Sequence, residues 1–405
     1  MSVRARHLIP LLGACSAIGS VGNYLFLPAL PQIGEFYGVD AGATQLTFTT
    51  YLVAFAVGVL VSGPLADRFG RRPILIGGVA LSGVAALLCY IAPTMGWFVL
   101  ARIAQGAAGG AGITVSRASV GDLFHERELA RMYAILTMAL VLGTSLAPYA
   151  GGLIARYSGW RSGFLMLAAA AVAISAACFA WLPETRAANA NSHSFAVLWR
   201  ESRAVIARPA FAGYVLEAAL IYALFFVFVS MAPHVMVTVQ HMPADRFGLY
   251  YLFLAVGFFF GNLLVSRAGA QARVAVQMNA GLALQFIGAL VALALVLLGF
   301  THPLYVFAPM MVFSFGQGLT LPHVIAHGIR LAPNYTGVAS SVFGFSQLAL
   351  SALAVQAMGY VPATSWLPAL WFCAIGAALT GVGVVGLKAL ENFANPRIGK
   401  AGPPA

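Results

Sequence analysis

The residues of this chain that could carry chemistry are few, and the acids can be judged one by one. The sequence of 405 residues holds eleven Asp and Glu, and nearly all of them lie in polar stretches. Glu217 differs, because it lies about seven residues into an apolar segment over 210–236. An ionised acid at the centre of a bilayer costs roughly 2.5–3.5 kcal/mol, which favours the neutral form. The position predicts a group that takes up and releases a proton. The alternative is an acid near the inner membrane surface, hydrated or paired with Arg208 or Arg330.

Arg102 is the basic residue that lies well inside an apolar segment. Arginine keeps its proton at physiological pH, so it is a poor proton carrier. A lipid-facing arginine is costly, and intramembrane charges face the protein interior or a cavity. We therefore expect Arg102 to donate hydrogen bonds to carbonyls of the first apolar segment or to a substrate.

His323 and His327 lie four residues apart, which places them on one face of a helix. A helical His pair can bind a metal ion, but no third ligand is evident, so we expect no metal site. For His323 we expect hydrogen bonding within the core, with a role in proton or substrate binding as the alternative.

The four cysteines all lie in apolar runs, where we expect buried thiols and no disulfide or metal site. They are Cys15, Cys89, Cys178 and Cys373. No nucleophile–base pair or phosphate-binding loop precedes a soluble domain, so we expect no enzyme activity and no cofactor.

The elements that must position these residues are membrane-spanning helices. The chain is 61% hydrophobic and 8% charged, whereas a soluble domain carries roughly 25% charged residues. A span needs about 20 apolar residues, and transmembrane barrels would instead alternate polar and apolar positions. The sequence predicts twelve spans, over 8–27, 45–66, 73–93, 95–116, 132–155, 162–182, 210–236, 247–265, 274–300, 303–326, 337–359 and 366–387.

The net charge of +11 is explained by membrane orientation and not by nucleic-acid binding. With the N-terminus in the cytoplasm, eighteen Lys and Arg fall on the inner side, and Arg156, Arg161 and Arg246 on the outer side. Basic residues accumulate on the cytoplasmic side, so both termini are predicted to be cytoplasmic. The first apolar run is long enough to remain as a span, so we expect no cleaved signal peptide.

A polar stretch divides the spans into two sets of six. We expect an N-terminal bundle over 1–182, a cytoplasmic linker over 183–209, a C-terminal bundle over 210–390 and a cytoplasmic tail over 391–405. Within the linker, apolar residues recur at helical spacing from Phe195 to Ile206. This pattern indicates an amphipathic helix on the inner membrane surface, with a partly ordered tether as the alternative.

The loop after the second predicted span has a dense pattern of turn and charged residues. Gly63 suits a close backbone approach, Gly70 a tight turn and Pro73 the first turn of the next helix. A loop with this full pattern resembles the signature between helices 2 and 3 of the major facilitator superfamily, and differs from an ordinary basic loop. The resemblance implies an inner gate. Its residues are Gly63, Asp67, Arg68, Gly70, Arg71 and Arg72.

Two further spans resemble the same superfamily. The order Leu-x-Arg-x-x-Gln-Gly around Arg102 is similar to the motif of its fourth helix. The fifth span resembles the helix 5 signature of the drug/proton antiporters, with Ala147 where glycine usually precedes the proline. The matching residues are Gly143, Pro148, Gly151 and Gly152. The runs over 27–31 and 337–341 resemble the bicyclomycin/chloramphenicol resistance subfamily.

The chain departs from this resemblance in its first span. Many relatives carry a carboxylate in helix 1, four residues before the proline that closes the span. Here that position is Tyr24, with Asn23 beside it. Proton coupling therefore does not follow from the resemblance alone. In the two-halves architecture helix 7 is the counterpart of helix 1, so Glu217 is a candidate substitute. The proton and substrate site is predicted from Glu217, Arg102, Asn23, Tyr24 and His323.

The resemblance implies an all-α integral membrane protein with twelve transmembrane helices in two pseudo-symmetric six-helix bundles. We expect proton-coupled efflux of small amphipathic drugs or toxic metabolites by alternating access. An uptake permease or a uniporter for a small metabolite is the alternative. A receptor or assembly protein on the same fold is disfavoured by the intact gate sequence. The expected partners are a small-molecule substrate, protons and membrane lipid, without nucleic acid. We expect a monomer in the cell inner membrane.

Overall fold

Helices make up the regular structure of the chain. The computed structural model describes residues 3–124, 126–185, 195–268 and 274–394, and no strand occurs within these ranges. Twelve helical segments in the described residues are long and apolar enough to cross a membrane. The predicted number of spans and the all-α fold are therefore confirmed. At most positions the predicted span ends agree with the helix ends to within a few residues. The first helical segment, and several others at their inner ends, extend further than predicted.

The N-terminal half contains seven α-helices and one short 3₁₀ turn within the described residues. They are α1 (Val3–Tyr24), η1 (Leu27–Ala29), α2 (Leu30–Tyr37), α3 (Ala41–Phe69), α4 (Arg71–Ile91), α5 (Met95–Leu123), α6 (Glu126–Tyr157) and α7 (Trp160–Trp181).

The first span continues further than the sequence predicted. The predicted end at residue 27 lies close to the end of α1, but η1 and α2 extend the helical path to Tyr37. Pro28 and Pro31 lack the backbone N–H of a helix interior, so they interrupt α1. Each proline is instead tolerated in the first turn of a new short element.

Local sequence also sets where the long helices begin and end. The Asp40 carboxylate accepts from the Ala43 backbone N–H at 2.7 Å and caps the N-terminus of α3. Gly70 ends α3 with a φ of 99°, a conformation that L side chains rarely adopt. Thr94 caps α5 by accepting from the Trp97 N–H.

The C-terminal half follows the same plan. It contains α8 (Phe195–Ile206), α9 (Pro209–His234), η2 (Val235–Val239), α10 (Ala244–Ala268), α11 (Val274–Leu297), α12 (Pro303–Arg330), η4 (Pro333–Tyr335), α13 (Thr336–Gly359) and α14 (Leu367–Ala394). The helix predicted in the linker is present as α8, and its Trp199 is exposed. Its position at a membrane surface stays a prediction. The element η2 is a π-helical turn that follows Pro233 in α9.

By packing, the chain forms two compact units. The first consists of Met1–Phe195, Val229–Leu252 and Ala352–Ser365, and the remaining segments form the second. The units group segments by contact and not by chain order, so the predicted division of the chain into two bundles, a linker and a tail stays a prediction.

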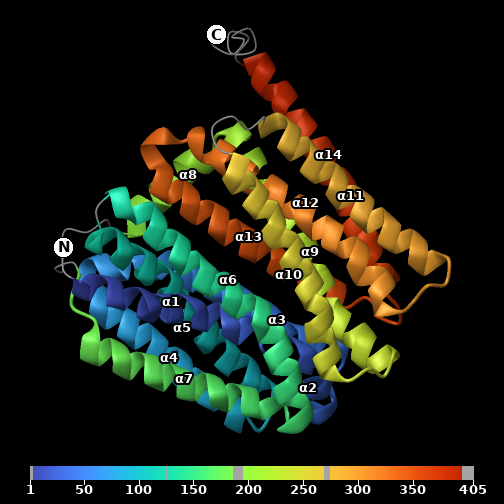
Figure 1. Cartoon of the computed structure of the whole chain (residues 1–405), viewed down its shortest axis with the longest axis horizontal. Helices are drawn as coiled ribbons and strands as arrows, with labels where there is room; N and C mark the ends of the chain where they lie inside the picture. Colours follow the sequence, from blue (N-terminus) through green and yellow to red (C-terminus); the bar gives the residue numbers. More distant parts are fainter. Residues whose placement is uncertain (1–2, 125, 186–194, 269–273, 395–405) are drawn as a thin grey trace. The chain divides into compact units, whose positions relative to one another are not determined.

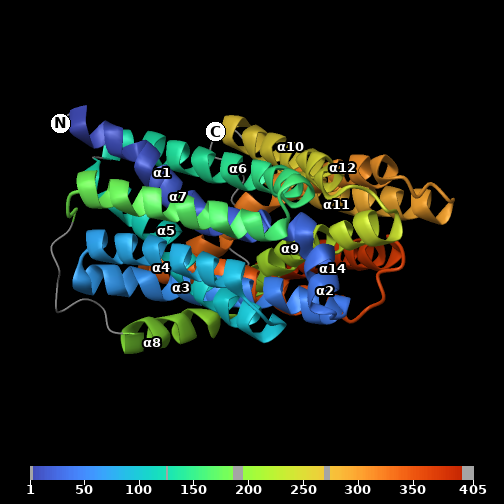
Figure 2. The same cartoon turned by 90° about the horizontal axis from the view of Figure 1, so that it is seen from below.

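In the first unit, α1 packs against α5, α6 and α7, and α5 also packs against α3 and α4. The start of α1 and the helix α2 lie at opposite ends of this bundle (Figures 1 and 2). Small residues let the helices approach closely. A Cβ on Gly58 of α3 would overlap the carbonyl oxygen of Ala107 in α5, and one on Gly110 would overlap the Gly58 backbone. Close backbone contact of this kind drives helix packing in lipid.

The second unit has its own apolar core, built from residues such as Phe211, Tyr214, Val324 and Phe343. Buried amides link its helices. Gln317 Nε2 donates to the Ile221 carbonyl at 2.8 Å, and Gln285 Nε2 donates to Thr320 Oγ1 at 3.2 Å. These bonds satisfy polar groups that an apolar environment would otherwise penalise.

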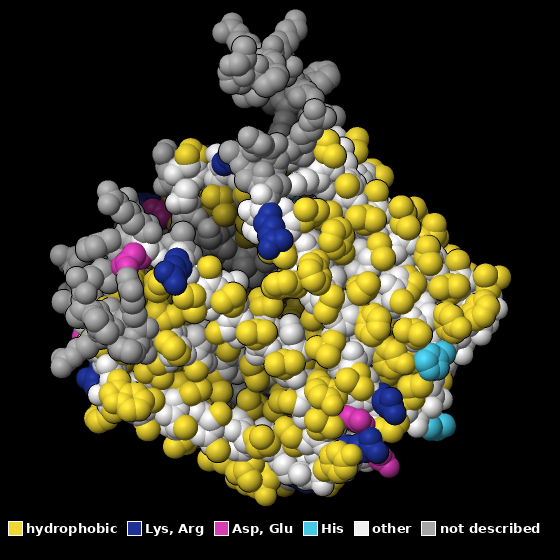
Figure 3. Space-filling model, in the orientation of Figure 1, with side chains coloured by type: hydrophobic (Ala, Val, Ile, Leu, Met, Phe, Trp, Pro, Cys, Tyr) yellow, Lys and Arg dark blue, Asp and Glu magenta, His cyan; other side chains and the backbone are white. Residues whose placement is uncertain are grey.

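The surface carries many large apolar side chains. Hydrophobic side chains cover most of the face in Figure 3, and the few charged side chains lie in its upper part and at its lower right. Many large apolar residues are exposed, among them Leu88, Trp97, Val172 and Phe179. Exposed apolar area of this extent is costly in water, so the surface fits a lipid environment.

Candidate functional site

Arg102 lies at the centre of a polar cluster in the first unit. Its guanidinium is fully buried. Nη1 donates to Gln105 Oε1 at 2.6 Å and to the Gly22 carbonyl at 3.2 Å, and Nη2 donates to Asn23 Oδ1 at 3.3 Å. Within the described residues it forms no ion pair with a carboxylate. Arg102 therefore remains a buried positive charge that is stabilised by neutral oxygens.

The end of α1 explains why these oxygens converge. α1 ends at Tyr24, so the Gly22 carbonyl lies in a last turn whose acceptors lack partners within the helix. Arg102 supplies the missing donor from α5. The prediction that Arg102 donates to carbonyls of the first span is confirmed by this bond.

Aromatic rings complete the surroundings of the guanidinium. Its central carbon lies 3.9 Å from the ring centroid of Phe26 and 4.0 Å from that of Tyr51. Such cation–π contacts are worth about 2 kcal/mol or more when desolvated. The Tyr51 hydroxyl in turn donates to the Gly19 carbonyl of α1. Aromatic faces and neutral acceptors thus replace the counter-ion.

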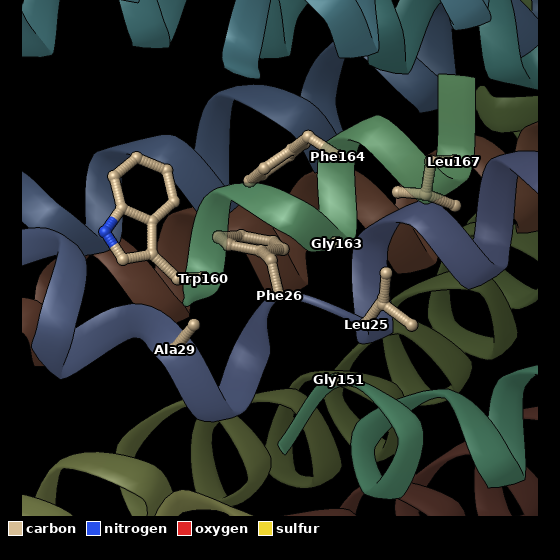
Figure 4. Close-up of a pocket in the computed structure, with 8 residues that line it drawn as sticks. All are labelled: Leu25, Phe26, Ala29, Gly151, Trp160, Gly163, Phe164 and Leu167. Carbon is tan, nitrogen blue, oxygen red and sulfur yellow. The ribbon is translucent and has the colours of Figure 1, made fainter. Parts of the chain in front are cut away.

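A small cavity lies beside this cluster (Figure 4). Phe26 of the α1–η1 break meets Trp160 and Phe164 of α7 around it, with Leu25 and Gly151 on its wall. Its volume is about 10 Å³, which is the space of about one water molecule. The cavity is too small for a substrate, so the aromatic residues here serve packing.

Of the two other residues predicted near the first span, Asn23 contacts Arg102. Asn23 is buried and bonded to Arg102, as described above. Tyr24 is half-buried, and its ring centroid lies 6.0 Å from that of Tyr251 in α10. Asn23 and Arg102 are therefore in contact, and Tyr24 lies in the same unit.

Glu217 lies in the second unit and is 3% exposed. Its Oε1 has no hydrogen-bond partner in the described residues. Its other oxygen faces Gly383 of α14, where an added Cβ would lie 2.7 Å from Oε2. The described residues show no pairing with Arg208 or Arg330. Arg208 instead donates to the Leu331 carbonyl at 2.8 Å, and Arg330 is exposed.

His323 also belongs to the second unit. It is buried, and its Nε2 lies 2.7 Å from Oε1 of Gln277 in α11. This contact is the core hydrogen bond that the sequence favoured for His323. Among the described residues, no group of three His, Cys, Asp or Glu side chains could hold a metal ion. The four cysteines are buried and free, and the Sγ atoms of Cys15 and Cys178 face each other at 3.3 Å.

The loop between α3 and α4 is held by a network of charges. Arg71 bonds Asp67 at 2.8 Å and, through Nε, Asp122 at 3.1 Å. The Glu184 carboxylate accepts from the backbone N–H groups of Arg71 at 2.8 Å and Arg72 at 3.2 Å. A carboxylate there satisfies the free N–H groups of a helix N-terminus and the positive end of its dipole.

Two details of this loop differ from the expectations. The room around Gly63 is ordinary, since an added Cβ would lie 3.7 Å from Thr114, so the expected close approach at Gly63 is wrong for the described residues. Gly70 is required by its φ and by Glu184, whose Oε2 would lie 2.6 Å from an added Cβ. Arg68 is exposed and lies over the ring of Phe69.

The sequence reasoning missed Asp122 and Glu184 as members of this network. Because acids are scarce in the chain, the few acids at neighbouring helix ends are the natural partners for the arginines and N–H groups of this loop. That scarcity is the signal by which both residues could have been found.

The helix 5 motif lies on α6, where its glycines permit backbone contact. A Cβ on Gly151 would overlap the Leu25 carbonyl oxygen, and one on Gly152 would lie 2.6 Å from the Asp245 Cα. A Cβ on Gly143 would lie 2.9 Å from the Val21 side chain. Pro148 is buried in the middle of α6. The motif therefore packs α6 against α1 on one side and against the start of α10 on the other.

An ion pair lies beside this contact. Arg156 Nη1 bonds both carboxylate oxygens of Asp245, at 3.0 and 3.1 Å. The Gln356 amide of α13 also donates to the Gly42 carbonyl at 3.2 Å, and Gly359 packs against Gln45. Segments of α10 and α13 are thus joined to the N-terminal helices within one unit, at the end where the sequence places the outer membrane surface.

Comparison with known proteins places this geometry in a family. Residues 12–355 match the family model of the Major Facilitator Superfamily. A bicyclomycin resistance protein homolog of Haemophilus influenzae is 27% identical over 353 residues, which cover 84% of this chain and 86% of that protein. A chloramphenicol resistance protein of Pseudomonas aeruginosa is 28% identical over 383 residues, with 94% and 84% covered.

Solved structures show the same fold at low sequence identity. A bacterial homolog of the human lysosomal transporter Spinster superposes with a TM-score of 0.75 at 14% identity, covering 100% of both chains. The xylose transporter XylE of E. coli superposes with a TM-score of 0.69 at 14% identity, covering 94% of this chain and 97% of that one.

Proposed function

The chain belongs to the Major Facilitator Superfamily, and from this premise we propose that it exports small amphipathic compounds in exchange for protons. The chain is a transporter and not an enzyme, as the family and the fold indicate. The proposed direction and substrate class are supported by relatives whose names refer to bicyclomycin, chloramphenicol and multidrug resistance. The observation that carries proton coupling is the buried, unpaired carboxyl group of Glu217.

Glu217 is suited to carry the proton because its neutral form is the stable one when the site is closed. An ionised carboxylate at this depth costs roughly 2.5–3.5 kcal/mol, and no described donor offsets that cost. Deprotonation therefore requires that water or another donor reach the group. Conformational change in a transporter provides such access on alternate sides.

Arg102 has the opposite role in this proposal. It keeps a fixed charge at the end of α1, and it orients Asn23 next to the half-buried Tyr24. We assign Asn23 and Tyr24 to contacts with the polar part of a substrate, and Arg102 to holding the end of α1 in place. His323 remains a candidate for the substrate site in the second unit.

Alternating access requires that the contacts closing the outer side and those closing the inner side break in turn. The contacts of Gly152 and Arg156 with Asp245 must break when the outer side opens, so we assign them to the outer gate. The Asp67–Arg71–Asp122 network belongs to the inner gate in the same proposal. Glycine at the α6 contact makes the closed state tight without fixing it by strong bonds.

Transport in a defined system tests the proposal. We would express the chain in a host that lacks its main efflux pumps and measure susceptibility to a drug panel, with and without a protonophore. Resistance that the protonophore removes is expected. Unchanged susceptibility to every compound would contradict export of drugs.

A uniporter for a small metabolite is the second candidate, because the first span carries Tyr24 where many relatives carry an acid. Purified protein in liposomes separates the two functions. An imposed pH gradient drives net uphill movement of substrate only if transport is coupled to protons. Movement that merely equalises the substrate concentration would favour the uniporter.

A further inference from the structure

A second, larger cavity lies within the second unit. Residues of three helices line it. Two of these helices, α11 and α12, lie side by side (Figure 1). Its volume is about 260 Å³. The lining residues are Tyr214 of α9, Val274, Ala275 and Met278 of α11, and His323, His327 and Arg330 of α12.

The donors of this cavity form a ladder on α12. His323, His327 and Arg330 are spaced four and three residues apart, so they follow one face of the helix. Arg330 is exposed, His327 half-buried and His323 buried, so the ladder runs from the mouth of the cavity to its base. Tyr214 is buried opposite, and its ring centroid lies 4.8 Å from that of His327.

The charged side chains around this ladder are positive. Among the described residues no acid lines the cavity, and α11 has no charged residue between Val274 and Leu297. Glu217, on α9, faces Gly383 of α14. Arg208 adds a further positive charge near the end of α12, where it bonds the Leu331 carbonyl. Within the described residues, Arg330 forms no ion pair. The cavity therefore presents a positive potential that its own described side chains do not neutralise.

The opposite wall of the cavity is apolar. Val274, Ala275 and Met278 offer methyl and thioether groups and no hydrogen-bonding side chain. A ligand that fits both walls has an anionic group for α12 and an apolar part for α11. The volume is slightly below the range of about 300–1,000 Å³ that is typical of drug-sized ligands, so a single head group with a short apolar extension fits best.

We propose that this cavity binds the phosphate group of an amphipathic phosphate ester. A tetrahedral phosphate accepts hydrogen bonds from several directions, which matches donors that come from Tyr214 of α9 and from His327 and Arg330 of α12. The Arg330 guanidinium can bind two of its oxygens at once. Gln277 Oε1 accepts from His323 Nε2, which leaves the base of the cavity polar and the ring fixed in orientation.

Two sources could supply such a group. One is an anionic phospholipid, because the sequence places the end of α12 at the cytoplasmic surface, where lipid head groups lie. The other is a soluble phosphate ester or inorganic phosphate from the cytoplasm. The proposal concerns a binding site and does not depend on which compound the transporter moves.

Binding is tested on the purified full-length protein in a neutral detergent. The thermal unfolding midpoint is measured with inorganic phosphate against potassium chloride of equal ionic strength. It is also measured with phosphatidylglycerol against phosphatidylcholine. A saturable rise of about 2–5 °C is expected from at least one phosphate-bearing probe.

Arg330→Gln and His327→Gln should each weaken the apparent affinity for that probe about tenfold. The control is Arg267→Gln, which removes an exposed arginine at the end of α10 outside the cavity.

The outcomes separate the sources. A rise with phosphatidylglycerol alone assigns the site to lipid, a rise with inorganic phosphate alone assigns it to soluble phosphates, and a rise with both supports the shared group. No rise over the matched controls with either probe overturns the proposal. An equal loss in Arg267→Gln and Arg330→Gln also overturns it, because the effect would then be diffuse surface charge. If Arg330→Gln does not fold, Arg330→Lys keeps the charge, and His327→Gln still tests the site.

Discussion

Arg102 and Glu217 are equally withdrawn from solvent, at 0% and 3% exposure, yet their surroundings have opposite character. Arg102 has three hydrogen-bond acceptors and two aromatic faces around its charge. Glu217 has a carboxyl oxygen without any described hydrogen-bond partner and a glycine against the other oxygen. The Arg102 site stabilises a permanent charge, whereas the Glu217 site stabilises an uncharged side chain.

The difference shows how a transporter can use one buried group to hold its helices in place and another to couple transport to protons. A buried charge that the protein solvates completely holds helices in place, because moving it would leave several polar groups unpaired. A buried acid that nothing solvates changes its charge when access to water changes. In the proposed mechanism the first unit holds the fixed element, and the second unit holds the group that titrates.

The largest effect is expected at Glu217. Glu217→Gln keeps the shape of the side chain and removes its titration, so pH-driven transport in liposomes should be abolished while substrate counterflow remains measurable. The matched control is Glu201→Gln in α8, which should retain both activities. Full pH-driven transport by Glu217→Gln would break the comparison, because the unsolvated acid would then have no part in coupling.

Arg102 should be the next most sensitive position. Arg102→Ala leaves the Gly22 carbonyl and the Gln105 amide oxygen without their donor, at a cost of about 1–3 kcal/mol for each buried group. We expect strongly reduced transport and a lower unfolding midpoint, with normal membrane insertion because a charge has been removed. Arg102→Lys should rescue poorly, because lysine lacks the planar fork that reaches three acceptors. Wild-type activity in both variants would show that the solvated charge is dispensable.

Asp67 extends the comparison to a charge held at a helix end. Asp67→Asn should shift the resting population toward the inward-facing state by about tenfold, which corresponds to about 1.4 kcal/mol. The readout is the labelling rate of a single cysteine introduced where only inward opening exposes it, since the four native cysteines are buried. Glu35→Gln, at an exposed acid of α2 outside this network, is the control and should not alter labelling. An unchanged labelling rate in well-expressed Asp67→Asn would remove Asp67 from the gate.

The smallest effect is expected at the Arg156–Asp245 pair. Arg156 is 43% exposed in this pair, so solvent screening limits its contribution to at most about 1 kcal/mol, or about fivefold in a conformational ratio. Arg156→Gln and Asp245→Asn should each increase labelling of Gln45→Cys, a position that is buried near Gly359. The double variant should add little beyond either single change. Arg246→Gln, at the exposed neighbouring arginine, should not alter labelling. Full additivity of the two changes would mean that the pair does not act as a unit.

Much of the fold could be predicted because the membrane imposes simple rules on sequence. Span number follows from length and hydropathy, and the helix of α8 follows from its apolar spacing. Arg102 and Glu217 could be singled out because ionisable residues in apolar segments are rare. The continuation of the first span through η1 and α2 was missed, because Pro28 and Pro31 indicate a break without indicating that helical turns resume.

The site was less accessible to prediction, because its partners are far apart in the chain. Nothing in the local sequence of Glu184 indicates that its carboxylate caps α4, since the two are more than 100 residues apart. Gly63 was expected at a close contact from its motif, whereas the structure gives that role to Gly58 and Gly110. Which glycine meets a neighbouring backbone depends on where two helices cross, and composition does not specify the crossing.

The sequence by itself determined that this chain spans a membrane about twelve times, that its family is a transporter family, and that Arg102 and Glu217 are exceptional. Those conclusions rest on the cost of placing polar groups in hydrocarbon, which applies at each position separately. Only the tertiary structure decided that Arg102 is solvated by the end of α1 while Glu217 is left without a donor. Solvation of a buried charge depends on which helices meet it, and that is settled by the packing of segments far apart in the chain.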